Sequence, residues 1–365
     1  MWLAEHPKAV IVGDVFVMLV ASLLAVGILR RVVRSRIDQS RRSQKVAYFV
    51  GTILVAAVPF SVVFFSSPTD GVGGVLNVSA LLQHRPSVRR SNLFQVTIRT
   101  NQFGGPMTLW LRAHDHLGFK RVGPSRCPGS RFDAAEAEAV GVVAGAHVAG
   151  HREVRLYPAD LIVSKVLSAK SRVRVGDRLL AIDGHPVETA VDYLHLILSV
   201  LPVDQQMFTI KVHREGHVIE VKQRRASTGR AGLGFCLETA NKPTITGSEF
   251  VPTVPNGQSG NSNGLVTALA TVEALGGLPK LGGDVVVTGA VSRDGFVVPI
   301  GDADLKAVAA HRHRACAFLV PSRTPYSDNE AEAKSAHEPG LLIIPVSTLD
   351  EAIAQINVLA KGTCR

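Results

Sequence analysis

Two long apolar runs near the start of the chain constrain its fold most strongly. Residues 9–29 contain a single charge, Asp14, and residues 46–65 contain none. About 20 apolar residues in a helix span a hydrocarbon core of about 30 Å, and a charge near the end of a span costs less than one at its centre. Neither run has the form of a cleaved signal peptide. We therefore expect a membrane anchor over 1–66 with two transmembrane helices; the alternative for the first run is an interfacial helix.

Residues 30–45, between the two runs, carry most of the net charge. Seven basic residues and one acid give this loop +6 of the protein's +10. Short basic loops stay in the cytoplasm, so the pattern predicts a multi-pass protein of the cell membrane whose residues after 65 are extracytoplasmic. No aromatic residue is interleaved with the basic ones, and the pattern therefore favours the lipid bilayer as a partner over nucleic acid.

Metal and disulfide signals are weak. The four cysteines, Cys127, Cys236, Cys316 and Cys364, lack the spacing of a metal site and leave any disulfide pairing open. The run His114–His116 has no third ligand at a useful spacing, which indicates surface polar residues. We expect neither a metal nor another cofactor.

Residues 67–150 have the pattern of a small α/β region. Leu93–Ile98 alternates like a strand, and Ala134–Val148 is Ala-rich and helix-like. No residue pattern in this region indicates a particular chemistry.

Residues 151–228 have a β-rich pattern. Leu161–Leu167 is expected to be a strand, and Val175–Gly184 places a short apolar strand between two turn pairs, Gly-Asp and Asp-Gly. A helix and two further strands, Met207–Val212 and Val218–Lys222, come next. The order resembles a PDZ domain of the bacterial type.

A PDZ domain binds a peptide as an added strand beside a helix. The resemblance implies a groove between the strand at 161–166 and the helix near 191–198, lined by Leu161, Val163, Val191, Leu194 and Leu198. Leu156–Ala159 occupies the place of the carboxylate-binding loop, although it lacks the Gly-rich form. The other interpretation is that the domain only spaces the membrane from the C-terminal part of the chain.

The run Gly257–Gly264, Gly-Gln-Ser-Gly-Asn-Ser-Asn-Gly, leads directly into an apolar helix. Ser262 is in phase with Leu265 and Leu269 on one face of that helix. A helix N-terminus offers free N–H groups and the positive end of the dipole, which suits an oxyanion. A serine alone at such a position is usually an N-cap.

Lys306 changes that interpretation. It follows Ser262 by 44 residues, after a Val-rich strand over 284–289 and the turn Pro299–Gly301, and it shares a helix face with Ala309 and Ala310. A lysine among small apolar residues is desolvated, so its pKa falls and it can act as a general base. Asp302 and Asp304 lie close in sequence, and negative charge there would favour the protonated amine.

These residues resemble the proteolytic domain of the Lon family, expected over 229–365. The family's Gly-Pro-Ser-Ala-Gly is here Gly260–Gly264, its Pro-Ile-Gly turn is followed by Lys306, and its Thr-Gly pair is Thr288–Gly289. The whole order is similar to the ATP-independent, membrane-anchored PDZ–Lon-like proteins of bacteria. The sequence has no Gly-x-x-x-x-Gly-Lys-Ser/Thr motif.

The resemblance implies an α+β fold of membrane anchor, small α/β region, PDZ domain and Lon-type domain, and a serine endopeptidase acting on protein or peptide substrates. Ser262 would attack the scissile carbonyl, Lys306 would move the proton and Thr288 would orient Lys306. Backbone N–H groups around Ser262 and Asn263 would hold the oxyanion, and Asn263 and Gly264 would be supporting residues. Asparagines replace the proline and alanine beside the family's serine, so the alternative is a degenerate peptide-binding scaffold. A homo-oligomer is compatible with either function.

Overall fold

The described residues form a mixed α+β fold, as the sequence predicts. The computed structural model describes residues 67–78, 82–83, 91–103, 119–121, 127, 133–168, 171–225, 232–252, 260–362 and 364. Within these ranges no helix is both long and apolar enough to cross a bilayer. The two expected spans, 9–29 and 46–65, lie outside the described residues, as do His114–His116.

The chain divides into two compact units, residues 1–71 with 100–124 and residues 72–99 with 125–365. In the described part of the first unit, strand β4 (Phe119–Arg121) pairs antiparallel with the beginning of β1 (Ser67–Asn77). The features described below belong to the second unit, except that the beginning of β1 and the end of β3 (Leu93–Phe103) lie in the first.

A largely parallel sheet organises the C-terminal half of the second unit. Its strand order is β18 (Leu342–Val346), β17 (Ala317–Pro321), β14 (Val285–Val287), β3 (Leu93–Phe103) and β1. Strand β14 runs parallel to both neighbours, with Val286 opposite Phe318 and Phe94. Strands β14 and β17 are buried along their whole length, which explains why they are apolar without alternation.

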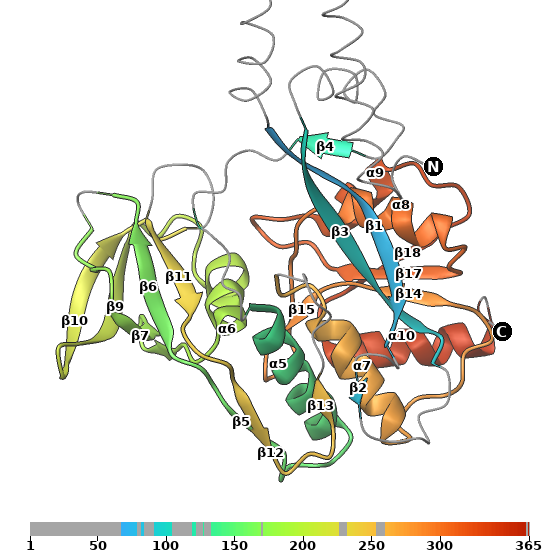
Figure 1. Ribbon diagram of the computed structural model, residues 1–365, viewed down its shortest axis with the longest axis horizontal. Helices are drawn as coiled ribbons and strands as arrows, with labels where there is room; N and C mark the ends of the chain where they lie inside the picture. The colour runs from blue at the N-terminus through green and yellow to red at the C-terminus, as the bar shows by residue number, and fades with distance from the viewer. Residues whose placement is uncertain are drawn as a thin grey trace, which may run out of the picture. The chain divides into compact units, whose positions relative to one another are not determined.

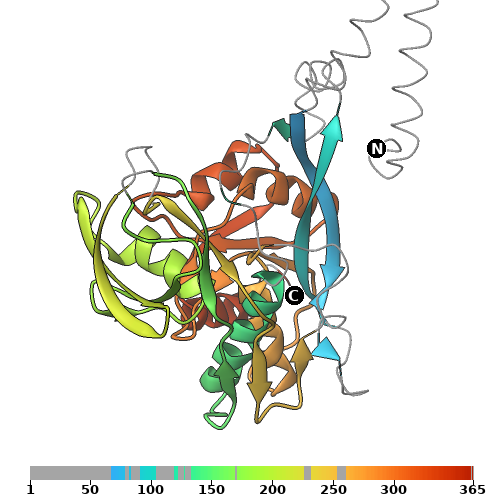
Figure 2. The same ribbon diagram turned by 60° about the vertical axis from the view of Figure 1, so that its left-hand side comes forward.

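Helices cover both faces of this sheet (Figures 1 and 2). Helices α7 (Gly264–Ala274) and α10 (Leu349–Lys361) pack on the face that carries Val285 and Val287. Helices α8 (Ala303–Arg312) and α9 (Asn329–Ser335) pack on the face that carries Val286. Because side chains alternate along a strand, the next residue after β14, Thr288, shares the α8 face with Val286.

Helix α5 (Asp133–Val148), which the Ala-rich run predicts, packs against α7 at very short range. A Cβ atom on Gly141 would lie 2.5 Å from the carbonyl oxygen of Gly264, and one on Gly145 would lie 2.4 Å from that of Ala268. Residues four apart share a helix face, so the two glycines let the helix backbones touch. The expected region 67–150 thus supplies β3 and α5 to the same compact unit as α7.

A second, antiparallel sheet has the order β10 (His217–Arg224), β9 (Met207–Arg214), β7 (Arg178–Ile182), β6 (Leu161–Val166) and β11 (Phe235–Thr239). Strand β8 (His185–Pro186) pairs with β7, and helix α6 (Ala190–His195) continues into the π-helical turn η3 (Leu196–Val200). Asp183-Gly184 and Glu215-Gly216 have positive φ, as tight hairpin turns require. We call residues 161–239 the β-rich lobe.

Short pairings and two disulfides complete the unit. β5 (Arg155–Tyr157) pairs with β12 (Thr244–Thr246), β2 (Leu82–Gln83) with β13 (Val251–Pro252), and β15 (Ala290–Val291) with β16 (Val297–Val298). The pairing that the sequence leaves open is Cys127–Cys236 and Cys316–Cys364.

Candidate active site

Ser262 lies in the turn directly before α7 and is tied to the end of β14. Its carbonyl oxygen accepts hydrogen bonds from the Gly289 amide at 2.9 Å and from the Thr288 hydroxyl at 3.4 Å. The Leu265 amide donates back to the Gly289 carbonyl at 2.9 Å. The side chain is half-buried. Ser259, the other serine of the run, lies outside the described residues.

Two backbone amides of this turn make no hydrogen bond within the part of the chain that the structure describes. The Gly264 amide donates to the Asn261 carbonyl, and the Leu265 amide is used by Gly289. For the amides of Ser262 and Asn263, no hydrogen bond is seen among the described residues. The N-cap Asn263 does not cap α7 with its side chain. Free amides at the positive end of a helix can stabilise developing negative charge.

Lys306 is a buried lysine on α8, with 4 % of its surface exposed. Alanines at 303, 307 and 310 on the same helix are buried with it. Burial lowers the pKa of its ammonium from 10.5 to about 8, against an opposing effect of Asp302 and Glu332. An amine with this pKa is neutral in a substantial fraction of molecules at mildly alkaline pH, as a general base must be.

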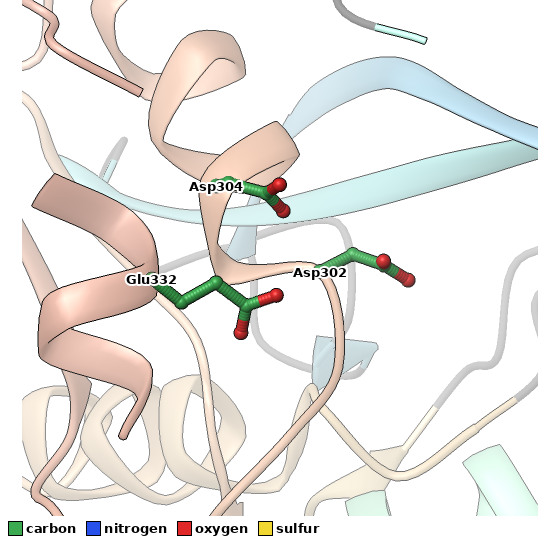
Figure 3. A group of neighbouring side chains, drawn as sticks. All are labelled: Asp302, Asp304 and Glu332. Atoms are coloured by element: carbon green, nitrogen blue, oxygen red, sulfur yellow. The ribbon is translucent and has the colours of Figure 1, made fainter. Parts of the chain in front are cut away.

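Three carboxylates gather at the beginning of α8. The side chains of Asp302, Asp304 and Glu332 have oxygens within 4.8 Å of one another (Figure 3). Asp302 and Glu332 raise the pKa of Lys306, whereas an oxygen of Asp304 accepts a hydrogen bond from the Leu305 amide. Sequence reasoning missed Glu332, because it comes from α9 and has no local relation to the lysine.

Thr288, which the sequence resemblance assigns to Lys306, makes its hydrogen bonds to the serine turn and to β17. Its buried hydroxyl donates to the Ser262 carbonyl, and its amide donates to the Leu319 carbonyl at 3.0 Å. Among the described residues, no hydrogen bond joins Thr288 to Lys306. Thr288 therefore supports the turn of the serine, since the strand end that carries it lies beside that turn.

Asn263 and Gly264 face α5. The Asn263 side chain is 2 % exposed, and its Nδ2 donates to Glu138 Oε1 at 2.7 Å. A Cβ atom on Gly264 would lie 3.1 Å from the Val291 amide nitrogen and 3.2 Å from the Ala137 carbonyl oxygen, so a larger residue would need the neighbouring backbone to move by a few tenths of an ångström. Sequence reasoning missed Glu138, which lies 125 residues before Asn263.

The expected peptide groove is not beside Leu161 and Val163. Both side chains are buried in the core of the β-rich lobe, and β6 has neighbours on both edges, β7 and β11. No strand can be added to an edge that is already paired. Of the other three expected groove residues, Val191 packs against Ala290 and Val298 of β15 and β16, and Leu194 and Leu198 pack against both this cluster and the core of the β-rich lobe.

The edge strand next to α6 is β11. The run Gly232-Leu233-Gly234-Phe235 leads into this strand. This Gly-rich run is the signal in the sequence that could have indicated the strand. Leu156–Ala159, the segment expected to be the carboxylate-binding loop, begins in β5, where Leu156 pairs with Ile245. The antiparallel sheet thus continues past residue 228 and includes β11.

Helix α6 also contacts the hairpin that joins the two candidate catalytic elements. His195 stacks on Phe296 with ring centroids 4.7 Å apart. Arg293 pairs with Glu188 at 2.5 Å, and its Nε lies 3.8 Å from Asp192. The segment between Thr288 and Lys306 is thus held by the β-rich lobe.

Comparison with known proteins identifies the C-terminal part. Residues 245–358 match the family described as Lon protease (S16) C-terminal proteolytic domain. The chain is 29 % identical over 224 residues to Lon protease 1 of Sorangium cellulosum (strain So ce56), which covers 57 % of this chain and 26 % of that protein. It is 37 % identical over 92 residues to Lon protease of Chloroflexus aggregans (strain MD-66 / DSM 9485), covering 25 % and 11 %. The chain thus aligns with a minor part of both relatives.

Proposed function

Residues 245–358 form a Lon-type proteolytic domain, and on this premise we propose that the protein is a serine endopeptidase with Ser262 as nucleophile and Lys306 as general base. The observation that carries the proposal is the buried Lys306, whose pKa is lowered to about 8. Burial of a lysine destabilises a fold. A role as general base would explain this burial, and Lys306 follows Ser262 after the strand and turn of the Lon-type pattern.

The proposed reaction uses one proton relay. As Ser262 Oγ attacks the scissile carbonyl carbon, Lys306 Nζ takes the hydroxyl proton, and the amides of Ser262 and Asn263 donate to the oxyanion. Lys306 then gives that proton to the leaving amine when the C–N bond breaks. A water molecule, deprotonated by the same amine, then attacks the acyl carbon; the ester C–O bond breaks, and Lys306 returns the proton to Ser262 Oγ. No nucleotide enters this scheme, which agrees with the lack of a Walker-type motif in the sequence.

We propose that the β-rich lobe is a PDZ module that presents peptides to this site. Its six-stranded sheet, the helix α6 and the run Gly232–Phe235 at the beginning of edge strand β11 support this assignment. A peptide would add to the free edge of β11. A peptide array should therefore bind the wild-type protein, and a proline at Leu237 in β11 should abolish that binding, because proline removes a strand amide.

We propose further that the protein is anchored in the membrane and that its catalytic domain lies outside the cytoplasm. The basic loop at 30–45 supports this topology, and so do the disulfides Cys127–Cys236 and Cys316–Cys364, because structural disulfides persist in oxidising compartments. Protease added to spheroplasts should digest a C-terminal tag. Full protection of the tag would overturn the topology.

The second candidate function is a peptide-binding scaffold without peptidase activity. Asn261 and Asn263 beside the serine and the carboxylates near Lys306 favour it. The Asn263 side chain, however, is buried against α5 and leaves the backbone amides of the turn open. Cleavage of an unfolded protein distinguishes the two functions, because a peptidase would cleave it and a scaffold would not.

The test is cleavage of fluorescently labelled casein without nucleotide, at mildly alkaline pH. Ser262→Ala should abolish cleavage, while Ser259→Ala, a matched change in the same run, should retain it. Lys306→Arg should also be inactive, because arginine keeps the charge but cannot be deprotonated. Cleavage retained in Ser262→Ala would overturn the nucleophile, and no cleavage by any variant would favour the scaffold.

A further inference from the structure

Glu138 and Asn263 share one hydrogen bond and leave two buried oxygens. Glu138 on α5 is fully buried, and its Oε1 accepts from Asn263 Nδ2 at 2.7 Å. The remaining oxygens, Glu138 Oε2 and Asn263 Oδ1, are buried without a hydrogen-bond partner among the described residues. These two oxygens belong to the same carboxyl and amide groups that the Nδ2–Oε1 hydrogen bond already joins.

An ionised Glu138 could not resolve this arrangement. A carboxylate and an amide oxygen are both acceptors only, and each buried acceptor without a donor costs about 1–3 kcal/mol. One proton on Oε2 removes both deficits at once, because a neutral carboxyl group donates through O–H to Oδ1 while it accepts from Nδ2. A carboxylic acid and a primary amide then form a ring of two hydrogen bonds.

The electrostatic surroundings agree with a neutral carboxyl group. Burial raises the pKa of Glu138 from 4.5 to about 7, although the Asn263 hydrogen bond and the positive charge of Lys242 act in the opposite direction. A hydrogen bond donated by the neutral acid would raise the pKa further, since it stabilises the protonated form.

We propose that Glu138 is protonated in the native protein and forms a cyclic acid–amide pair with Asn263 that positions the oxyanion-binding turn. This inference rests on the proposed function of Ser262. Glu138 touches neither substrate nor nucleophile, so it is a positioning residue that acts through Asn263. Its ionisation would place a negative charge beside Asn263 Oδ1, repel the amide oxygen and displace the amide that follows Ser262.

The first test compares substitutions at Glu138 by their pH profiles for kcat. In the wild-type protein, kcat should decline at alkaline pH as Glu138 loses its proton. Glu138→Gln keeps a donor and an acceptor without a proton to lose, so it should retain kcat within about twofold and lose this alkaline decline. Glu138→Ala should lower kcat by on the order of tenfold or more, as small misplacements of catalytic groups do. Circular dichroism must show that it is folded.

Glu136→Gln is the matched control. Glu136 lies on the same helix, is fully buried and has a pKa raised by burial to about 8, but its carboxylate accepts from the Ala190 amide at 2.9 Å and not from the serine turn. The alkaline limb should therefore survive in Glu136→Gln. Its loss there, or equal damage in Glu138→Gln and Glu138→Ala, would overturn the positioning role.

The second test does not depend on catalysis. Glu136, whose pKa is raised to about 8, would contribute to the same infrared band, so both proteins compared carry Glu136→Gln. In the Ser262→Ala/Glu136→Gln protein, the infrared band of a protonated carboxyl group should persist at neutral pH, and adding Glu138→Gln should remove the intensity of one carboxyl group from it. Ionisation of Glu138 at the pH of an ordinary glutamate would refute the acid–amide pair even if the peptidase is active. If no variant cleaves peptides, this measurement still decides the pair, and only the proposed function fails.

Discussion

The amide of Gly289 donates a 2.9 Å hydrogen bond to the carbonyl of Ser262 and so fastens the serine turn to the end of β14. The same strand end begins the hairpin that leads to α8 and Lys306. The segment from Gly289 to α8 therefore links the turn that carries Ser262 to the helix that carries Lys306. The charges around α8 do not contribute to the Ser262–Gly289 hydrogen bond, so they can be changed separately from the serine turn.

The pH dependence of activity should report on Lys306. Its pKa of about 8 predicts that kcat/KM rises through about pH 8 as the amine loses its proton. Asp302→Asn and Glu332→Gln should each move the rising limb to lower pH, because each removes a negative charge that favours the ammonium. Asp304→Asn, the matched control, should leave the limb in place. A shift for Asp304→Asn as large as for Asp302→Asn would contradict this assignment.

Burial of Lys306 should cost stability. The folded pKa of about 8 lies below the unfolded value of 10.5. Between these values the unfolded chain binds a proton that the folded protein lacks, so the free energy of unfolding rises with pH. Below pH 8 both states hold the proton and the full cost remains, about 3 kcal/mol.

Lys306→Met should therefore raise the free energy of unfolding by about 3 kcal/mol at neutral pH, while abolishing cleavage. Urea unfolding at neutral pH and near pH 10 measures the effect, which should shrink at the higher pH. The exposed Lys361 gives the control, since Lys361→Met should change stability by less than about 0.5 kcal/mol. A destabilised Lys306→Met protein would speak against the lowered pKa.

The close packing of α5 on α7 predicts that Gly141→Ala is destabilising. Alanine favours a helix by about 1 kcal/mol over glycine, but its Cβ would lie 2.5 Å from the Gly264 carbonyl oxygen. We expect the steric clash to outweigh the helix preference. The free energy of unfolding measured in urea should fall by about 1–3 kcal/mol, and activity should be lower. Val148→Ala, at the exposed end of the same helix, is the control. Increased stability of Gly141→Ala would show that the helices can separate freely.

The disulfide Cys316–Cys364 should contribute strongly to stability. It closes a loop with a sequence separation of 48, and the chain-entropy estimate for such a loop is about 4 kcal/mol. The Cys316→Ala/Cys364→Ala protein should unfold at lower urea concentration, and reductant should change its midpoint less than that of the wild type. Identical midpoints for oxidised and reduced wild-type protein would argue that the bond does not form in solution.

Local patterns were enough to find the elements of the C-terminal part. The Gly-rich run before α7, the Val-rich strand β14 and the small-residue face of α8 each lie within one stretch of sequence, and the structure has all three. Turn pairs such as Asp183-Gly184 likewise marked the hairpins of the β-rich lobe.

Relationships between distant segments were not predictable in the same way. The pairing of β6 with β11 joins residues about 70 positions apart and occupies the edge of β6 at which the sequence predicts a groove. Glu332 and Glu138 reach Lys306 and Asn263 from other helices. Such contacts follow from packing of whole helices and strands, and single-residue spacing carries no information about them.

Helix α5 determines which fragments of this protein can be studied alone. Its Glu136 accepts the Ala190 amide at the beginning of α6, and its Glu138 holds Asn263 before α7; two positions along a helix turn the side chains by about 200°, toward opposite sides. A fragment comprising residues 229–365 would include Ser262 and Lys306 but leave the contact surface of α7 bare. Any minimal catalytic fragment must therefore include 133–148, either in the same chain or added as a separate peptide.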